Sequence, residues 1–275
     1  MQKWLWIFVI ALVACNSVVT PTPTALPPPL VSVVTVTAPP FVPLTVTTGA
    51  SLPQPVTPLP KPAEPVKLTI TASDGANLVG LFYPPLTAPA PSVLLLPMLG
   101  GSKSDWDAFA RDLQRQGLAA LALDLRGYGE SAQPADWSKA PGDARTAWDA
   151  MVARKEVDAK ASALVGASIG ANLALIVGAN NAEVVTVIAL SPGEDYHGLT
   201  PSPLLPNFNG RPVLFVASQD DAYSYTSAQK MVTLAPAGET YYLANAGHGT
   251  AMFSNPNLEL ALIDWLRKQL GILKG

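Results

Sequence analysis

A five-residue corner between an apolar strand and an apolar helix constrains this chain more than any other feature. Residues 163–174 read ALVGASIGANLA, so a G-x-S-x-G pattern from Gly166 to Gly170 joins a predicted strand to a predicted helix. Glycines suit a strained strand-to-helix turn, because side chains there would collide with neighbouring backbone. The turn would present the Ser168 hydroxyl at the N-terminus of the helix, where free N–H groups favour developing negative charge. Ser168 is therefore the candidate nucleophile.

Alternating strands and helices surround this corner and predict a mostly parallel sheet with helices on both faces. A β-hairpin is expected over 67–83, with further strands at 92–96, 118–123, 161–165, 184–190, 212–217 and 239–243. Helices are expected at 105–116, at 143–154, directly after Ser168, at 224–234 and at 257–270. Continuous apolar runs such as 92–96 fit strands that are buried on both faces of a parallel sheet.

The N-terminus has the pattern of an export signal. Its apolar run at 4–14 has the length of a signal-peptide core and is shorter than a helix that spans a bilayer. The run ends in Leu12-Val13-Ala14-Cys15, which resembles the lipobox of bacterial lipoproteins. We expect a signal peptide at 1–14, and the resemblance implies lipidation of Cys15 and attachment to the outer side of the bacterial cell membrane. The alternatives are an ordinary secretory signal and an uncleaved anchor.

A proline-rich and threonine-rich segment at 15–65 separates this signal from the rest of the chain. Proline prevents helix and ladder pairing, so we expect a disordered, extended linker there and a globular domain at 66–275. A net charge of −3 does not indicate a nucleic-acid partner. Cys15 is the single cysteine, which excludes an internal disulfide. We expect neither a metal nor a cofactor, and the sequence does not indicate an oligomeric state.

Four motifs in a fixed order make residues 66–270 similar to the α/β-hydrolase family. The loop at 97–101 keeps the Gly-Gly of the family's oxyanion loop, but Pro-Met replaces the usual His-Gly. Residues 124–131, DLRGYGES, match the family's D-x-R-G-x-G-x-S, whose Asp and Arg are expected to fix loop geometry. The Ser168 corner is the third motif. His248 is the fourth, because it follows the last predicted strand, where the family places its catalytic histidine.

The acid of the implied triad has more than one candidate. Family spacing, counted as three residues past a small residue in the position of Ser218, selects Asp221. Asp220 is the next choice. Some relatives instead take the acid after the preceding strand, where Glu194 and Asp195 stand. The second histidine, His197, is expected to be a solvated lid residue.

The resemblance implies a serine hydrolase of carboxylic esters that works through an acyl-enzyme. His248 would accept the Ser168 proton, Asp221 would orient the imidazole, and the N–H groups of Leu99 and Ile169 would bind the oxyanion. Small acyl esters are the expected substrates, and thioesters, lactones or peptides are chemical alternatives. A catalytically weak or inactive binding module of the envelope is the competing hypothesis, and the Pro97-Met98 departure favours it.

The interval 191–211 is short and rich in Pro and Gly, so it has room for a lid but not for a cap domain. This resembles the uncapped, dienelactone-hydrolase-like branch of the family and implies a preference for short-chain esters. We expect an apolar roof over a small acyl pocket with Tyr196 and His197 at its rim; the roof residues are Leu199, Leu204, Leu205 and Phe208.

Overall fold

The computed structural model describes residues 61–131 and 133–273. The expected signal peptide, Cys15 and most of the expected linker lie outside the described residues. The described part falls within one compact unit. It includes no helix that is both long and apolar enough to cross a membrane.

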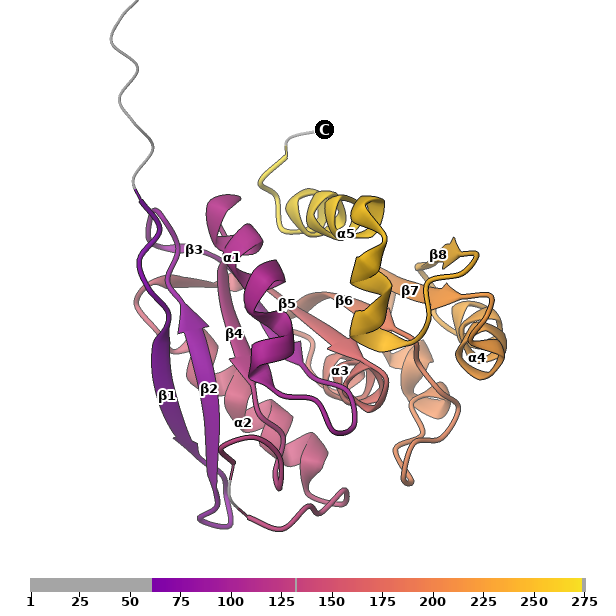
Figure 1. The fold of residues 1–275 in the computed structure, drawn as a ribbon, viewed down its shortest axis with the longest axis horizontal. Helices are drawn as coiled ribbons and strands as arrows, with labels where there is room; N and C mark the ends of the chain where they lie inside the picture. The colour runs from indigo at the N-terminus through magenta and orange to yellow at the C-terminus, as the bar shows by residue number, and fades with distance from the viewer. Residues whose placement is uncertain (1–60, 132, 274–275) are drawn as a thin grey trace, which may run out of the picture. The chain divides into compact units, whose positions relative to one another are not determined.

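Eight strands form a single sheet in the order β1-β2-β4-β3-β5-β6-β7-β8 (Figure 1). The two pairings made by β2 are antiparallel, and all the others are parallel. The strands are β1 (Val66–Thr71), β2 (Asn77–Tyr83), β3 (Ala90–Leu96), β4 (Ala119–Leu123), β5 (Val157–Ala167), β6 (Val184–Leu190), β7 (Val213–Ser218) and β8 (Gly238–Leu243). This mostly parallel sheet confirms the predicted fold class.

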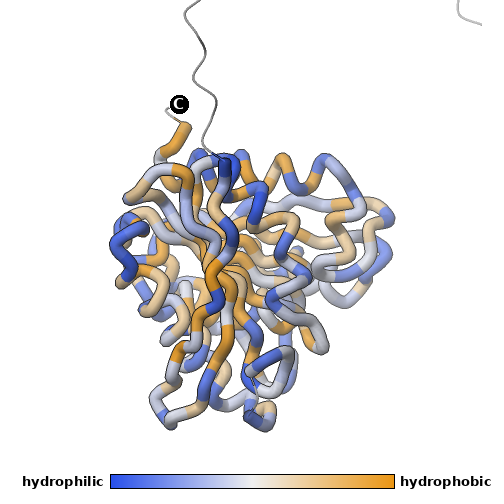
Figure 2. The backbone as a smooth tube through the Cα atoms, turned by 60° about the vertical axis from the view of Figure 1, so that its left-hand side comes forward, coloured by the Kyte–Doolittle hydropathy of each residue, from blue (hydrophilic) through white to orange (hydrophobic). Residues whose placement is uncertain are grey.

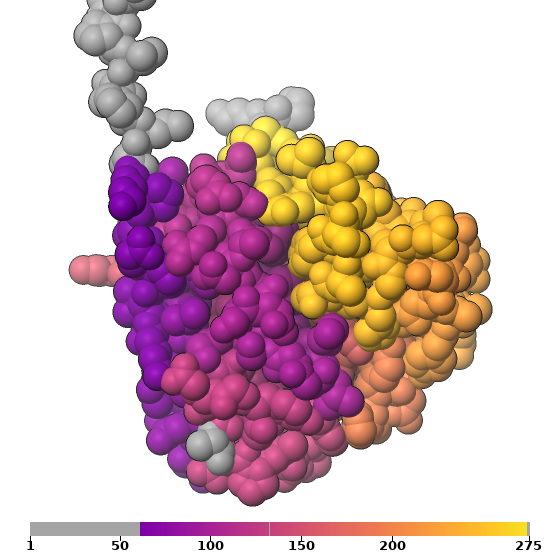
Figure 3. All heavy atoms as spheres, viewed as in Figure 1, coloured from indigo at the N-terminus to yellow at the C-terminus, as the bar shows by residue number. Residues whose placement is uncertain are grey.

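Helices cover both faces of the sheet. One apolar core lies under α1 (Asp107–Arg115) and α5 (Pro256–Gln269), whose surfaces adjoin in Figure 3. The other core lies under α2 (Ala140–Val152), α3 (Ile169–Ala179) and α4 (Ala222–Val232). Three 3₁₀ helices complete the described elements: η1 (Lys103–Trp106), η2 (Ser202–Phe208) and η3 (Gly249–Ser254).

The central strands are apolar along their whole length because both of their faces are covered. In β3, Leu94 and Leu96 belong to the core under α2–α4, whereas Val93 and Leu95 belong to the core under α1 and α5. This alternation follows from the two-residue period of a strand. Figure 2 shows hydrophobic segments concentrated in the middle of the sheet.

Two element boundaries differ from the sequence expectation by three or more residues. Helix α2 begins at Ala140, three residues earlier than expected, because Pro141 occupies its first turn, where a missing N–H has no cost. Strand β5 begins at Val157, four residues earlier than expected, although Asp158, Ala159 and Lys160 are exposed. The pairing of Val157 with Ala90 of β3 accounts for this extension.

Candidate active site

The strand-to-helix corner at Ser168 has the strained backbone that the motif predicts. Ser168 has φ 54° and ψ −120°, a region that L-residues rarely adopt. A Cβ on Gly166 would overlap the carbonyl oxygen of Gly170, so only glycine fits there. The Ser168 N–H donates to the Leu190 carbonyl of β6 at 2.8 Å. These constraints hold the Ser168 side chain at the carboxyl end of β5, immediately before α3.

The loop after β3 lies directly against this corner. A Cβ on Gly170 would overlap the Leu96 and Pro97 carbonyl oxygens, so helix α3 approaches the loop backbone closely. The Gly101 N–H donates to the Met98 carbonyl at 3.0 Å and closes a tight turn around Leu99. Within the described residues, neither the Leu99 N–H nor the Ile169 N–H donates a hydrogen bond to protein. Both N–H groups are therefore free to bind an anionic oxygen.

His248 and Asp221 form a hydrogen-bonded pair at the carboxyl ends of β7 and β8. His248 Nδ1 lies 2.6 Å from Asp221 Oδ2, and the Asp221 side chain is 16% exposed. Burial alone would raise the pKa of Asp221, but hydrogen bonds from Ser224 and His248 outweigh it and lower that pKa below its ordinary value. The carboxylate is thus ionised and placed to orient the imidazole.

Asp220 has a different set of partners from its neighbour. Its carboxylate accepts hydrogen bonds from the Ser218 hydroxyl and from the N–H groups of Ala246 and Gly247. Asp220 therefore anchors the loop that precedes His248 and does not contact the imidazole. Asp220 thus fixes the loop that precedes His248, and Asp221 contacts the imidazole ring.

The residues just after His248 are fixed by the strand end opposite. Ser191, wholly buried at the end of β6, accepts the Gly249 N–H on its hydroxyl oxygen at 2.9 Å. The Thr250 hydroxyl lies 3.7 Å from the sulfur of Met98 on the loop after β3. The histidine loop is therefore held from both sides of Ser168.

Tyr196 also belongs to this cluster, although the sequence placed it only at a rim. Its hydroxyl lies 3.1 Å from Ser224 Oγ, and its ring is edge-on to the His248 ring with centroids 6.5 Å apart. Burial raises the pKa of Tyr196 above its ordinary value, although hydrogen bonding to Ser224 and Ser168 opposes that rise. The hydroxyl is therefore neutral, and it is anchored by Ser224 and by the Ser191 carbonyl beside the candidate triad. The sequence pattern gave no sign of its contact with Ser224 and His248.

The alternative acids after β6 are used elsewhere. Glu194 forms an ion pair with Lys230 of α4 and accepts a hydrogen bond from Ser202. Asp195 accepts the Gly198 N–H at 2.6 Å within its own turn. Neither carboxylate contacts His248.

The D-x-R-G-x-G-x-S motif forms a buried brace beside the site. Asp124 is wholly buried, and its carboxylate accepts the N–H groups of Lys103 and Glu130 and the Lys103 ammonium. A Cβ on Gly129 (φ 55°) would overlap that carboxylate. Asp124 thus links the loop after β4 to η1 and has no free face for a substrate.

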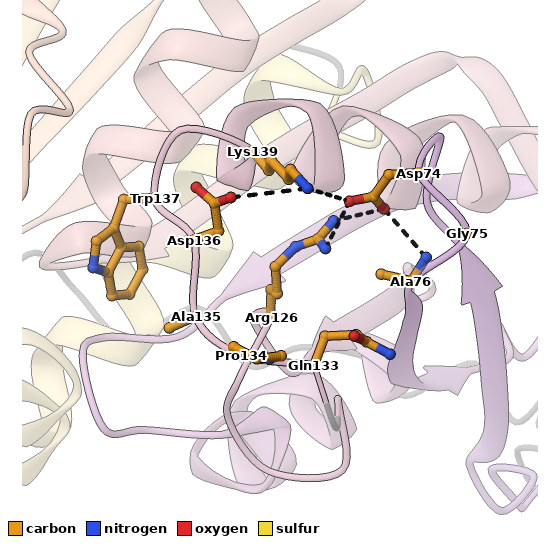
Figure 4. Close-up of a pocket in the computed structure, with 10 residues that line it drawn as sticks. All are labelled: Asp74, Gly75, Ala76, Arg126, Gln133, Pro134, Ala135, Asp136, Trp137 and Lys139. Atoms are coloured by element: carbon orange, nitrogen blue, oxygen red, sulfur yellow. Dashed lines mark hydrogen bonds and ion pairs between the residues drawn. The ribbon is translucent and has the colours of Figure 1, made fainter.

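Arg126 extends the brace toward the hairpin. Its guanidinium pairs with Asp143 of α2 at 2.6 Å and with Asp74 of the β1–β2 turn at 2.9 Å. Lys139 reaches the same Asp74 carboxylate at 2.8 Å. Asp74, Arg126 and Lys139 line a hollow of about 560 Å³. Figure 4 shows the charged groups of these three residues directed at one another. The hollow is therefore polar, and the charged side chains that line it are paired with one another.

The short lid differs in its packing from the expected roof. Leu205 and Phe208 are wholly buried in the core, and Phe208 packs beside Gly178 of α3. Leu199 is also buried, and its carbonyl accepts a hydrogen bond from Asn172 of α3. These side chains therefore do not roof an acyl pocket. His197 is exposed, as expected, and stacks on Trp137 at 5.1 Å.

Comparisons with known proteins place this geometry in context. Residues 91–214 match the family model described as alpha/beta hydrolase fold. No curated protein sequence gives a significant match. Within the described residues, no group of three His, Cys, Asp or Glu side chains could hold a metal ion.

Solved structures share the fold at low sequence identity. A 2,6-dihydroxy-pseudo-oxynicotine hydrolase is 17% identical, with a TM-score of 0.67 over 76% of this chain and 68% of its own. The dienelactone hydrolase of Anabaena variabilis is 19% identical, with a TM-score of 0.61 over 78% and 100%. Est1E of Butyrivibrio proteoclasticus is 15% identical, with a TM-score of 0.63 over 74% and 99%. The described part of the chain thus has the α/β-hydrolase fold.

Proposed function

We propose that this protein is a serine hydrolase of small carboxylic esters, attached to the outer side of a bacterial membrane through Cys15. The observation that carries the proposal is the 2.6 Å contact between His248 and Asp221, beside a serine on a strained corner that opens a helix. Similarity to esterases and a dienelactone hydrolase supports the reaction class.

The residues account for acyl transfer in two steps. In the first step Ser168 Oγ attacks the acyl carbonyl while neutral His248 accepts its proton, and Asp221 stabilises the imidazolium. The N–H groups of Leu99 and Ile169 receive the oxyanion. His248 then returns the proton to the leaving alcohol, and water releases the acid from the acyl-enzyme by the reverse sequence.

A catalytically weak binding module is the second candidate. Among the hydrogen bonds of the described residues there is none between Ser168 and His248. Catalytic hydrogen bonds are often long without a substrate, so this observation does not by itself decide against catalysis.

Labelling of the full-length protein by a fluorophosphonate and hydrolysis of p-nitrophenyl acetate test the proposal together. Ser168→Ala should abolish both, because loss of a triad member lowers kcat by on the order of 10⁴ to 10⁶. Ser92→Ala is a matched control, since Ser92 is a wholly buried serine on β3 whose hydroxyl lacks a partner within the described residues. Turnover above about a hundredth of wild type in Ser168→Ala would contradict the proposal.

A further inference from the structure

A tight turn in the lid places Tyr196 against the candidate triad. Tyr196 and Leu199 are joined by backbone hydrogen bonds in both directions, so His197 and Gly198 form a two-residue turn with φ of 54° and 82°. Positive φ at both positions is the geometry of a type I′ turn, which glycine adopts freely and histidine does not. Stacking of His197 on Trp137 offsets that strain.

The turn is also held in place by a side chain of helix α3. Asn172, wholly buried on α3, donates from its amide to the carbonyls of Gly193 and Leu199 at 2.8 and 2.7 Å. Its amide oxygen accepts the Gly193 N–H at 3.0 Å. The two ends of the lid segment are therefore tied to the same helix that Ser168 opens, and Tyr196 between them has a fixed position.

The Tyr196 ring is packed tightly beside the candidate triad. A Cβ on Gly193 would lie 2.6 Å from the ring, and the ring of Tyr223 lies edge-on at 5.7 Å. The hydroxyl contacts Ser224 Oγ at 3.1 Å and the Ser191 carbonyl at 3.4 Å. Contacts on several sides, and an anchored hydroxyl, leave the ring little freedom to move aside for a substrate.

Ser168 does not line any of the four larger hollows found in the described part of the chain. These hollows have volumes of about 440 to 660 Å³ and are lined by other residues. The lid leucines and Phe208 that would have roofed an acyl pocket are packed in the core or turned to another hollow. The phenol of Tyr196 lies at the candidate active site, against Ser224, the Ser191 carbonyl and the His248 ring.

We propose that the ring of Tyr196 sets the upper limit of acyl-chain length, so that this residue determines specificity in the proposed esterase. The inference rests on the proposed function. The oxyanion donors occupy the β3 side of Ser168, and His248 must face the leaving alcohol. The acyl chain is therefore directed toward the lid after β6, where it meets Tyr196.

Removal of the ring should lengthen the preferred chain. Each methylene of the acyl chain that becomes buried against an apolar surface should raise kcat/KM about four-fold. In Tyr196→Ala the ratio of kcat/KM for p-nitrophenyl hexanoate over butyrate should rise on the order of ten-fold. Tyr196→Phe keeps the ring and loses only the hydroxyl, so its chain-length profile should match that of the wild type. Tyr225→Ala is a control, because that tyrosine packs against Tyr242.

The full-length protein should be assayed on p-nitrophenyl esters from acetate to octanoate, with thermal melts of each variant. An unchanged profile in a folded Tyr196→Ala, or a shift already present in Tyr196→Phe, would overturn the proposal. If Tyr196→Ala does not fold, Tyr196→Leu can replace it, because leucine retains apolar packing. This variant should show a smaller shift of the chain-length profile in the same direction. An unchanged profile would again contradict the proposal. Absence of wild-type hydrolysis of every ester would instead refute the proposed function.

Discussion

Met98 lies so close to Gly249 that a single added Cβ would lie 2.9 Å from its sulfur. These residues belong to the loop after β3 and to the start of η3, which follow strands far apart in the sequence. Gly249 directly follows His248, and Met98 directly precedes Leu99. The contact therefore packs the loop that carries the candidate oxyanion donor Leu99 against the loop that carries the candidate base. It also shows how the Pro97-Met98 departure fits: the methionine packs against the histidine loop.

Gly249→Ala should therefore damage activity more than stability. Gly249 has φ 58°, and alanine there costs roughly 1–2 kcal/mol in backbone strain and must also displace the Met98 sulfur. Displacement of the site by about an ångström costs on the order of 10²-fold in turnover. Gly117→Ala supplies the control, since Gly117 has φ 83° with no atom within 4 Å of the added Cβ. It should lose similar stability and keep its activity. Equal activity in the two variants would show that the contact has no role.

The two adjacent aspartates should respond very differently to amidation. Asp221→Asn removes the charge that faces His248 Nδ1 at 2.6 Å and favours the wrong tautomer, so kcat should fall on the order of 10⁴-fold. Asp220→Asn keeps an oxygen that accepts the N–H groups of Ala246 and Gly247, so its effect should be mild. Steady-state kinetics with thermal melts would check both. The opposite ranking would assign the acid to Asp220.

The sequence was most informative where one short segment determines its own geometry. The G-x-S-x-G corner needs only local backbone to be strained, and the run Val93–Leu96 needs only two covered faces to be a strand. The choice of the acid had to be accurate to one residue, because Asp220 and Asp221 follow the same strand and their side chains have different partners. Counting from Ser218 selected the carboxylate that contacts His248.

Contacts between residues far apart in the sequence could not be predicted in the same way. The sequence predicted that Leu205 and Phe208 would roof the acyl pocket. Both are instead buried in the core, where Gly178 has no side chain and leaves room for the ring of Phe208. Tyr196 lies against the ring of His248 in a turn where His197 is left-handed and stacks on Trp137, 60 positions earlier in the chain. Neither periodicity nor a motif encodes such a pair.

Cys15→Ser tests the predicted attachment to the membrane. Lipidation needs the cysteine thiol, so the variant should lose labelling by a fatty-acid probe and move from the detergent phase to the aqueous phase. One acyl chain binds a bilayer only marginally, so stable attachment implies more than one chain on the protein. Thr24→Ser, a conservative change in the expected linker, should keep both properties. Membrane partition that persists in Cys15→Ser would indicate an uncleaved apolar anchor.

The Arg126 brace should make the fold sensitive to acid. Hydrogen bonds from Arg126, followed by those from Lys139, hold the pKa of Asp74 well below its usual value of 3.8. A carboxylate whose pKa is depressed by folding contributes stability that is complete above its unfolded pKa and is lost as the pH falls toward its folded pKa. The melting temperature of the wild type should therefore decline between about pH 5 and pH 2, and that of Asp74→Asn should decline less steeply. Asp264→Asn, which removes an exposed carboxylate on α5 that is absent from the ion pairs found in the described residues, should follow the wild-type slope. Parallel slopes for all three proteins would mean that the Asp74–Arg126 pair does not couple folding to pH.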